Sequence, residues 1–258
     1  MQNHPHDSIC SCSHDKIYEE MKVRFDKSMQ VGESMRKKSA DYLAAHTDTS
    51  AGADKNILVF TAEPGYQPMT AETFVDFPLD QKVGGIRILD MDGCEVPAVV
   101  KHLGRTFTYT LPDDRFRQPA FVDRFAVTML IPADGAVGTR MFRVLPTETQ
   151  EERKAKVFCD GKVLENEFLR ITFAENGSFM MENIRNGRVY GPCNLFEDTK
   201  DGGNTYNYAP VDGDTALTTE NAKAELSYSE DAISASVTAS LVLGEETIRT
   251  VVTLYEGA

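Results

Sequence analysis

The sequence predicts a mainly β protein with a long α-helix at its N-terminus, that is, a fragment of a helical bundle followed by one or more β-sandwich domains. Apolar residues recur in steps of three and four over residues 13–45, the period of an α-helix. From residue 57 onward, short runs rich in Val, Ile, Phe, Tyr and Thr are separated by Gly, Pro and Asp. Such regularly spaced runs, without helical stretches between them, are typical of a β-sandwich.

The N-terminal helix is predicted to run from Ser13 to Ala45, with Ser13 as N-cap and Asp15 in the first turn. Its apolar face includes Ile17, Met21, Phe25 and Met29. A helix of this length is not stable in isolation and needs partners along that face. No second helical stretch of this kind follows in the sequence, so we expect the chain to be part of a longer protein.

Two polar stretches divide the rest of the chain. HTDTSAGADKN follows the helix, and TETQEERKAK follows a proline at the end of a strand-like run. We therefore expect residues 1–50 to belong to a helical domain, 55–147 to form a β-sandwich, and 155–258 to begin a larger, truncated β-sandwich. The last strand-like run reaches the C-terminus with its pattern intact, which would leave an open sheet edge.

The third region contains two further local signals. LRITFAENGSFMMENI predicts a β-hairpin with its turn at Asn176 and Gly177. The segment from Asp198 to Asp214 is rich in Gly, Asn, Asp and Tyr and predicts a long loop. Long loops in compact domains often carry function.

Composition excludes several classes of partner. The 258 residues are 41% hydrophobic and 26% charged, as in a soluble globular protein. A formal net charge of −13 argues against nucleic acid and anionic membranes as partners. No apolar run approaches the roughly 20 residues that span a bilayer, and the N-terminus lacks the features of a signal peptide. Five scattered cysteines indicate reduced thiols rather than a disulfide framework.

The first candidate for chemistry is NHPHDSICSCSHD, where His, Asp and Cys crowd together. All three are zinc ligands. One interpretation is a self-contained zinc element at Cys10, Cys12 and His14. The other is a polar tail with two buried cysteines, which composition favours because no second ligand pair follows at zinc-finger spacing.

Two further candidates lie in the β-rich part. FEDTKDGGNTYNYAPVDGD combines carboxylates with tyrosines, which suits sugar recognition, but the residues alone favour somewhat more an acidic surface loop, with or without calcium. Its spacing does not match an EF-hand. Glu165 and Glu167 could form a carboxylate pair, although their strand-like context favours a solvated face.

Two of these segments, in this order, resemble one family. PHDSICSCSHDKIYEEMKVRFDKSMQ resembles the start of the helical middle domain of glycoside hydrolase family 38 α-mannosidases, especially bacterial ones. LENEFLRITFAENGSFMMENIRNGRVYGPCNLFEDTKDGGNTYNYAPVDGD resembles the β-domain that follows there. The resemblance covers most of the chain; residues 55–147 match by position and strand character.

The resemblance implies a zinc-dependent retaining α-mannosidase that hydrolyses terminal α-mannosides. His6 would be one ligand of a divalent zinc ion, and Asp7 and Tyr206 would contact the substrate. The catalytic residues and the other three zinc ligands would lie outside this chain, which by itself would be inactive. Two departures from the family pattern, Ser11 for Gly and Asn204 for Asp, put the turn before the helix and the charge of the loop in doubt.

The expected partners follow from this resemblance. They are an α-mannoside or mannosylglycerate-like sugar and the rest of a full-length enzyme, in a bacterial cytoplasm, with a homo-oligomer as a further candidate. Nucleic acid and membranes are not expected. The alternative function is a non-catalytic β-sandwich module that binds carbohydrate or a partner protein.

Overall fold

The structure is a computed structural model, which describes residues 12–62, 64, 67–112, 114–133, 135, 137–204 and 207–257. The chain divides into two compact units. One comprises Met1–Asp48 and Phe196–Thr219, and the other Thr49–Leu195 and Glu220–Ala258. The predicted division into residues 1–50, 55–147 and 155–258 stays a prediction.

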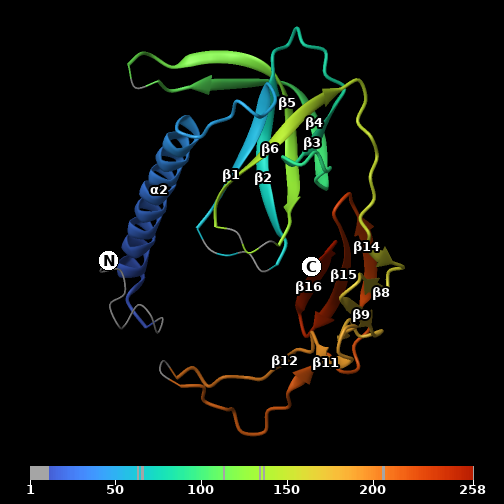
Figure 1. Cartoon of the computed structure of the whole chain (residues 1–258). Coiled ribbons are helices and arrows are strands. Elements are labelled where there is room, and N and C mark those ends of the chain that lie inside the picture. The colour runs from blue at the N-terminus through green and yellow to red at the C-terminus, as the bar shows by residue number, and fades with distance from the viewer. Residues whose placement is uncertain are drawn as a thin grey trace. The chain divides into compact units, whose positions relative to one another are not determined.

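The helix of the first unit is α2, Asp15–Ala45 (Figure 1). The predicted N-cap, Ser13, is wrong by one residue. His14 is the N-cap, and its ring nitrogen accepts a hydrogen bond from the backbone N–H of Lys16 at 3.4 Å. A ring nitrogen thus takes the place expected for the serine hydroxyl. The predicted C-terminal end of the helix is confirmed.

Most of the large apolar side chains of α2 are exposed. Among the described residues, Met21 is the buried member of the helix. The exposed ones are Ile17, Tyr18, Val23, Met29, Val31, Met35, Tyr42 and Leu43. Two ion pairs along the helix, Glu20 with Arg24 and Lys37 with Asp41, are also exposed and add little stability. Within the described residues, the apolar face therefore lacks the cover that its sequence predicts.

The second unit begins with two antiparallel sheets (Figure 1). One has the order β1–β6–β3, with β1 at Lys55–Thr61, β6 at Gly138–Thr147 and β3 at Gly85–Leu89. The other has the order β2–β5–β4, with β2 at Met69–Phe77, β5 at Gln118–Ile131 and β4 at Ala98–Thr110.

These two sheets share one hydrophobic core. Alternate residues of each strand point inward, and Phe77 meets Phe125 edge to face with ring centres 5.9 Å apart. The buried cluster consists of Ile57, Val75, Phe77, Val83, Ile86, Ile88, Val96, Phe125, Val127, Met129, Ile131, Phe142 and Val144. The predicted mainly β fold with a long N-terminal helix is confirmed.

Two elements of this region differ from the sequence-based expectation. β2 was not predicted, because its first half is polar and half-exposed and its apolar alternation is confined to the last residues. β4 is one long strand, whereas the sequence predicts two separate strand-like runs, VPAVVKHL and RTFTYTL. A β-bulge between His102 and Gly104 joins them, with Gly104 at φ +69°, a conformation that glycine adopts without strain.

The remaining strands form further antiparallel sheets. One has the order β11–β10–β9–β8–β7, with β7 at Phe158–Cys159, β8 at Val163–Glu165, β9 at Leu169–Phe173, β10 at Phe179–Asn183 and β11 at Arg188–Cys193. Another has the order β14–β15–β16, with β14 at Glu225–Glu230, β15 at Ser234–Leu243 and β16 at Glu246–Tyr255. Both sheets contribute to a second buried cluster: Val157, Leu164, Ile171, Phe173, Ala235, Val237 and Leu254.

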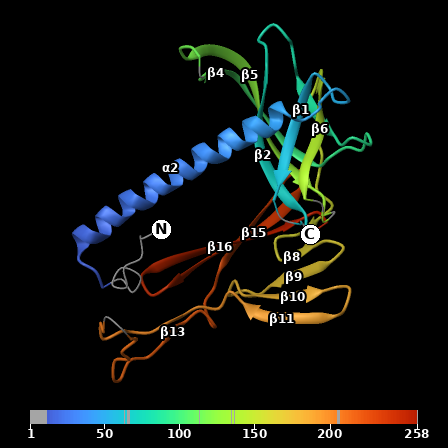
Figure 2. The ribbon, with the colours of Figure 1, turned by 60° about the vertical axis from the view of Figure 1, so that its left-hand side comes forward.

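The predicted hairpin turn between β9 and β10 is confirmed (Figure 2). Gly177 adopts φ +78°, and its N–H donates to the carbonyl of Ala174 at 3.0 Å. In the first unit, β12 at Glu197–Asp198 pairs with β13 at Leu217–Thr218. Within the described residues, no helix is long and apolar enough to cross a membrane.

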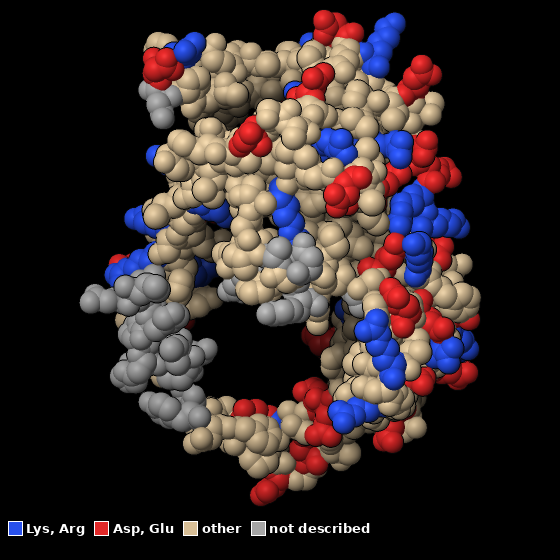
Figure 3. Space-filling view, viewed as in Figure 1, with Lys and Arg blue, Asp and Glu red and all other residues tan. Residues whose placement is uncertain are grey.

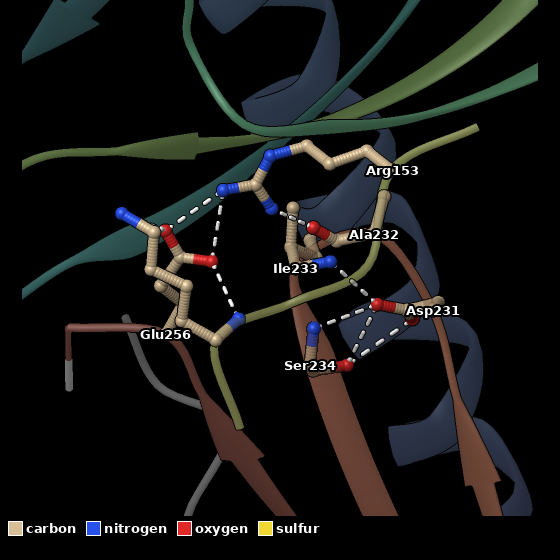
Figure 4. A network of polar contacts seen from close by, with 7 residues as sticks. Arg153, Asp231, Ala232, Ile233, Ser234 and Glu256 are labelled. Carbon is tan, nitrogen blue, oxygen red and sulfur yellow. Dashed lines mark hydrogen bonds and ion pairs between the residues drawn. The ribbon is translucent and has the colours of Figure 1, made fainter. Parts of the chain in front are cut away.

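Acidic and basic side chains are mixed over much of the visible surface (Figure 3). One acidic residue, Glu256, binds the charged stretch that begins at the end of β6, residues 147–156 (Figure 4). Its carboxylate accepts hydrogen bonds from Arg153 at 2.8 and 2.9 Å and from the N–H of Lys156 at 2.9 Å. Arg153 also donates to the carbonyl of Ala232. The charged stretch TETQEERKAK is thus tied to the end of β16 rather than solvated along its whole length.

Truncation of a large side chain in the core between the β1–β6–β3 and β2–β5–β4 sheets should lower the stability of the protein. Phe125 is 1% exposed, so Phe125→Ala is expected to lower the free energy of unfolding by roughly 3–5 kcal/mol through lost burial and a cavity. Urea unfolding measures this. The matched control is Phe74→Ala, since Phe74 is 60% exposed. Equal losses in the two variants would contradict the placement of Phe125 in the core.

The contributions of Glu256 and Arg153 to stability should depend on each other, because the two side chains are in contact. Removal of the carboxylate in Glu256→Ala leaves the half-buried Arg153 without its carboxylate partner, and we expect the free energy of unfolding to fall by about 1–3 kcal/mol. Arg153→Ala in the Glu256→Ala background should then cost much less than in the wild type. Glu245→Ala, at an exposed site, serves as control. Additive effects of Arg153→Ala and Glu256→Ala would show that the two side chains do not interact in solution.

Candidate functional site

The three residues predicted to bind metal or substrate, His6, Asp7 and Tyr206, lie outside the described residues. Two described segments of the first unit flank them in sequence. One is the start of α2, and the other is the loop between β12 and β13. The contacts in these two flanking segments show which of their side chains already have structural partners.

At the start of α2, His14, a ligand only in the alternative of a local zinc element, has a structural role. The Nδ1 of His14 accepts the capping hydrogen bond from Lys16, so this nitrogen serves the helix terminus. In the part of the chain that the structure describes, no three His, Cys, Asp or Glu residues are grouped to hold a metal ion. The local zinc element at Cys10, Cys12 and His14 stays a prediction, because Cys10 lies outside the described residues.

The loop that contains Tyr206 is closed at its base. The N–H of Phe196 donates to the hydroxyl of Thr219 at 2.9 Å, and the N–H of Thr219 donates to the carbonyl of Phe196 at 3.0 Å. Thr219 is fully buried. The short β12–β13 ladder follows directly. The two ends of the loop are therefore pinned together at one buried threonine.

Further along, Asp201 braces the loop from within. Asp201 forms an isolated β-bridge with Pro210, and the N–H of Gly202 donates to the carbonyl of Ala209 at 2.7 Å. One carboxylate oxygen of Asp201 accepts from the N–H groups of Gly203 and Ala209 at 3.0 and 3.2 Å. The residues before and after positions 205–206 are thus joined across the loop by backbone and carboxylate together.

A second carboxylate, that of Asp214, also has a structural role. It accepts from the N–H of Lys200 at 2.7 Å, and the ammonium of Lys200 lies 3.7 Å from it. The hydroxyl of Tyr208 donates to that of Thr199 at 2.9 Å. Asp201 and Asp214 therefore hold the loop. Asp212 is a further, exposed carboxylate of the loop, and Glu197 and Asp198 are exposed on β12 directly before it.

Asn204, which replaces the Asp of the family pattern, remains a hydrogen-bond acceptor. Its side-chain oxygen accepts from the N–H of Asn207 at 3.3 Å. An aspartate could accept the same bond, since only an acceptor oxygen is required. The replacement removes a negative charge from the loop and keeps this local contact.

Glu165 and Glu167, for which the sequence favours a solvated face over a carboxylate pair, have separate surroundings. Glu165 bonds to Arg170 on the neighbouring strand at 2.5 Å, and this hydrogen bond raises the pKa of the Arg170 guanidinium above its ordinary value. Glu167 is exposed. The central residue of this motif is Asn166, which is buried and links the β8–β9 turn to the carbonyl of Tyr255 at 2.9 Å.

Asn194 is a structurally important residue that the sequence analysis missed. It adopts φ +64°, and its amide donates to the carbonyl of Gly177 at 2.8 Å. Its side-chain oxygen accepts from the hydroxyl of Thr250 at 2.8 Å. Asn194 thus ties the β9–β10 turn to β16, directly before the loop. An asparagine opening NLFED was the available signal, because Asn tolerates the left-handed region.

A cavity of about 1100 Å³ lies in the second unit. Its lining combines charged and aromatic side chains, among them Asp90, Glu95, Asn166, Phe168, Arg185 and Glu256. The guanidinium of Arg185 lies 4.0 Å from the ring centre of Phe168. A concave site of this size, with a few polar groups and an aromatic ring, can accommodate a small hydroxyl-rich molecule.

Comparison with known proteins agrees with this architecture. Residues 66–146 match the family described as "Glycosyl hydrolases family 38 C-terminal domain 1". This stretch begins just before β2 and ends within β6. It therefore covers most of the first pair of sheets.

Longer similarities cover nearly the whole chain. A protein of Halalkalibacterium halodurans, named "Putative mannosylglycerate hydrolase", is 27% identical over 90% of this chain and 28% of its own length. The crystal structure of an α-mannosidase from Enterococcus faecalis V583 matches all of this chain and 35% of its own, with a TM-score of 0.86 and 25% identity. A second Enterococcus faecalis structure, of a family 38 glycosyl hydrolase, matches with a TM-score of 0.80 and 21% identity, over 36% of its length.

The chain thus spans about a third of the length of the proteins it matches. Family model, sequence similarity and fold all point to proteins of the same kind. This chain is homologous to the C-terminal part of the bacterial glycosyl hydrolases of family 38.

Proposed function

We propose that this chain is part of a zinc-dependent retaining α-mannosidase that hydrolyses terminal α-mannosides. The observation that carries the proposal is the match of the entire chain to an α-mannosidase, of which it spans 35%. On this proposal the nucleophile, the acid/base and three zinc ligands lie outside the 258 residues. The chain by itself is inactive.

Within this division of labour, His6 supplies one zinc ligand, through a neutral imidazole nitrogen. The zinc ion, when bound, orients the hydroxyls of the terminal sugar. Asp7 accepts hydrogen bonds from substrate hydroxyls. The choice of His6 over His14 is supported by the capping role of His14, whose ring nitrogen already accepts from Lys16.

Tyr206 supplies a second substrate contact from a distant point in the sequence. The support is the construction of its loop, which Thr219 closes at the base and Asp201 braces on both sides of positions 205–206. A contact residue is more effective when its loop is held in place before the substrate binds, because less conformational entropy is lost on binding. The substrate is an α-mannoside or a mannosylglycerate-like sugar.

A second candidate function is a non-catalytic module that binds carbohydrate. The cavity of about 1100 Å³ next to Phe168 and Arg185 favours it. Binding of sugar there would be independent of zinc and would be weakened by Phe168→Ala. The DNA on either side of the coding segment separates the two candidates, since an upstream α/β domain rich in His and Asp supports the enzyme.

The proposal is tested with the chain and with the longer protein of which it is part. The 258-residue chain should hydrolyse no aryl α-mannoside with or without added zinc. In the longer protein, His6→Ala should lower zinc content and reduce kcat by about 100-fold or more, since even residues behind metal ligands are worth 10- to 100-fold. Zinc analysis and aryl α-mannoside hydrolysis measure the two effects.

His14→Ala is the matched control. It removes a helix cap, at a cost of about 1 kcal/mol of stability, and should leave zinc content unchanged. Robust zinc-dependent hydrolysis by the 258-residue chain would overturn the division of labour. Loss of zinc in Cys10→Ser and Cys12→Ser but not in His6→Ala would instead favour the local zinc element.

A further inference from the structure

One aromatic side chain of the loop between β12 and β13 is exposed and yet held in place. The ring of Tyr208 is 57% exposed, and its hydroxyl donates a hydrogen bond to the hydroxyl of Thr199 at 2.9 Å. The two residues lie on opposite sides of positions 205–206, in the long loop that leaves β12 and returns to β13 (Figures 1 and 2). The hydroxyl of Tyr208 therefore tethers its ring across the loop.

The backbone on both sides of Tyr208 is held as well. The side-chain oxygen of Asn204 accepts from the N–H of Asn207 at 3.3 Å, and the carboxylate of Asp201 accepts from the N–H of Ala209 at 3.2 Å. A tyrosine side chain has only two torsions to fix. With its neighbours bound and its hydroxyl tethered, Tyr208 loses little further freedom when a ligand binds to it.

Thr199, which accepts the tether, is equally well supported. It directly follows β12, where Asp198 pairs with Leu217 of β13. On its other side, the N–H of Lys200 donates to the carboxylate of Asp214 at 2.7 Å. Both ends of the tether are thus fixed to the backbone of the loop, and Thr199 acts as a positioning residue for the ring of Tyr208.

The faces of the Tyr208 ring are open. Other exposed rings of the chain carry a cation: the guanidinium of Arg124 lies 5.0 Å from the ring centre of Phe74, and that of Arg117 lies 5.1 Å from that of Tyr109. Within the described part of the chain, neither a cation nor a second ring lies against Tyr208. A ligand can therefore stack on this ring without displacing another side chain.

The surroundings of the ring suit a sugar. The loop is rich in Gly, Asn and Asp, and Asp212 is an exposed carboxylate four positions after Tyr208. A sugar ring presents C–H groups on its faces and hydroxyls around its edge. It therefore matches an aromatic ring that is flanked by carboxylate and amide groups.

We propose that Tyr208 is a specificity-determining residue that stacks on a second ring of the substrate, next to the terminal mannose. This inference rests on the proposed function, in which Tyr206 contacts the terminal sugar. Two residues of chain span at most about 7 Å, so a substrate bound by Tyr206 comes within reach of Tyr208 when its aglycone is itself a ring. The tethered ring then holds that aglycone.

The substrate class follows from this arrangement. α-Mannosides whose aglycone is a further sugar ring gain the contact with Tyr208, whereas the glycerate of mannosylglycerate is acyclic and has no ring face to stack. Charge acts in the same direction. Residues 198–214 contain four acidic side chains and one basic side chain, and this loop repels the carboxylate of a glycerate. The preferred substrate is thus a neutral oligosaccharide that ends in α-mannose.

Kinetics of the longer protein of which this chain is part test the inference. Tyr208→Ala should raise KM for an α-linked mannose disaccharide about 10-fold. It should leave kcat nearly unchanged, because the contact with the aglycone is the same in the ground state and the transition state. KM for mannosylglycerate should change by less than about 2-fold. The matched control is Tyr228→Ala, since Tyr228 is 56% exposed, and it should affect neither substrate.

A second set of variants tests the tether. Tyr208→Phe keeps the ring and removes the donor, and Thr199→Val removes the acceptor. Each should raise KM for the disaccharide about 3-fold. The double variant should be no worse than either single variant, because both substitutions break the same hydrogen bond. Additive losses would refute the tether as the means by which the ring is held.

Three kinetic outcomes overturn the inference. Equal increases in KM for the two substrates would place Tyr208 against the terminal sugar instead of a second ring. Unchanged KM for both, with unchanged thermal unfolding, would show that Tyr208 contacts no substrate. A lower Tm together with a loss of kcat on both substrates would show a structural role alone.

Calorimetric binding of the disaccharide separates this inference from the proposed function. A longer protein that binds the disaccharide, about 10-fold more weakly in Tyr208→Ala, but hydrolyses no α-mannoside would refute the proposed function and support the contact with Tyr208. A protein that neither binds nor hydrolyses the disaccharide would refute both.

Discussion

The burial of one face of the β2–β5–β4 sheet is the constraint on which the fold of β1 to β6 depends. Phe77 and Phe125 meet at the centre of the core, and a slip of one residue in any strand would turn its apolar side chains to solvent. This constraint holds the register as far as the end of β2. Beyond it, the bulge at His102 and Gly104 sets the alternation of β4, and this alternation places the exposed Phe107 and Tyr109 on the same face as the buried Phe125.

Several residues of the family-like motifs act on the structure rather than on a ligand. Asn166 holds the β8–β9 turn to the end of β16. Asn194 joins the β9–β10 turn to β16 through hydrogen bonds from both ends of its amide. The carboxylates of Asp201 and Asp214 accept hydrogen bonds from backbone N–H groups. The order and spacing of a motif can therefore identify a family even where its polar side chains serve as braces.

The fold was largely predictable, because its signals are local. A period near 3.6 indicates α2, and Asn176 with Gly177 indicates the turn between β9 and β10. β2 escaped prediction because burial of its second half depends on partners far away in sequence. The site was less predictable for the same reason. Nothing local distinguishes Asp201, which braces the loop, from Asp212, another exposed carboxylate of the same loop, and the proposed ligand His6 lies outside the described residues.

The bulge in β4 has a consequence for how the exposed face of these strand ends can change over time. Insertion of one residue into β5 opposite the bulge would restore regular pairing and exchange the two faces of the paired strand ends, so that Thr106 and Thr108 would take the place of Phe107 and Tyr109. The strand pairs themselves would survive the change. A threonine surface and an aromatic surface at these strand ends are thus separated by the insertion of a single codon, without any change in the rest of the fold.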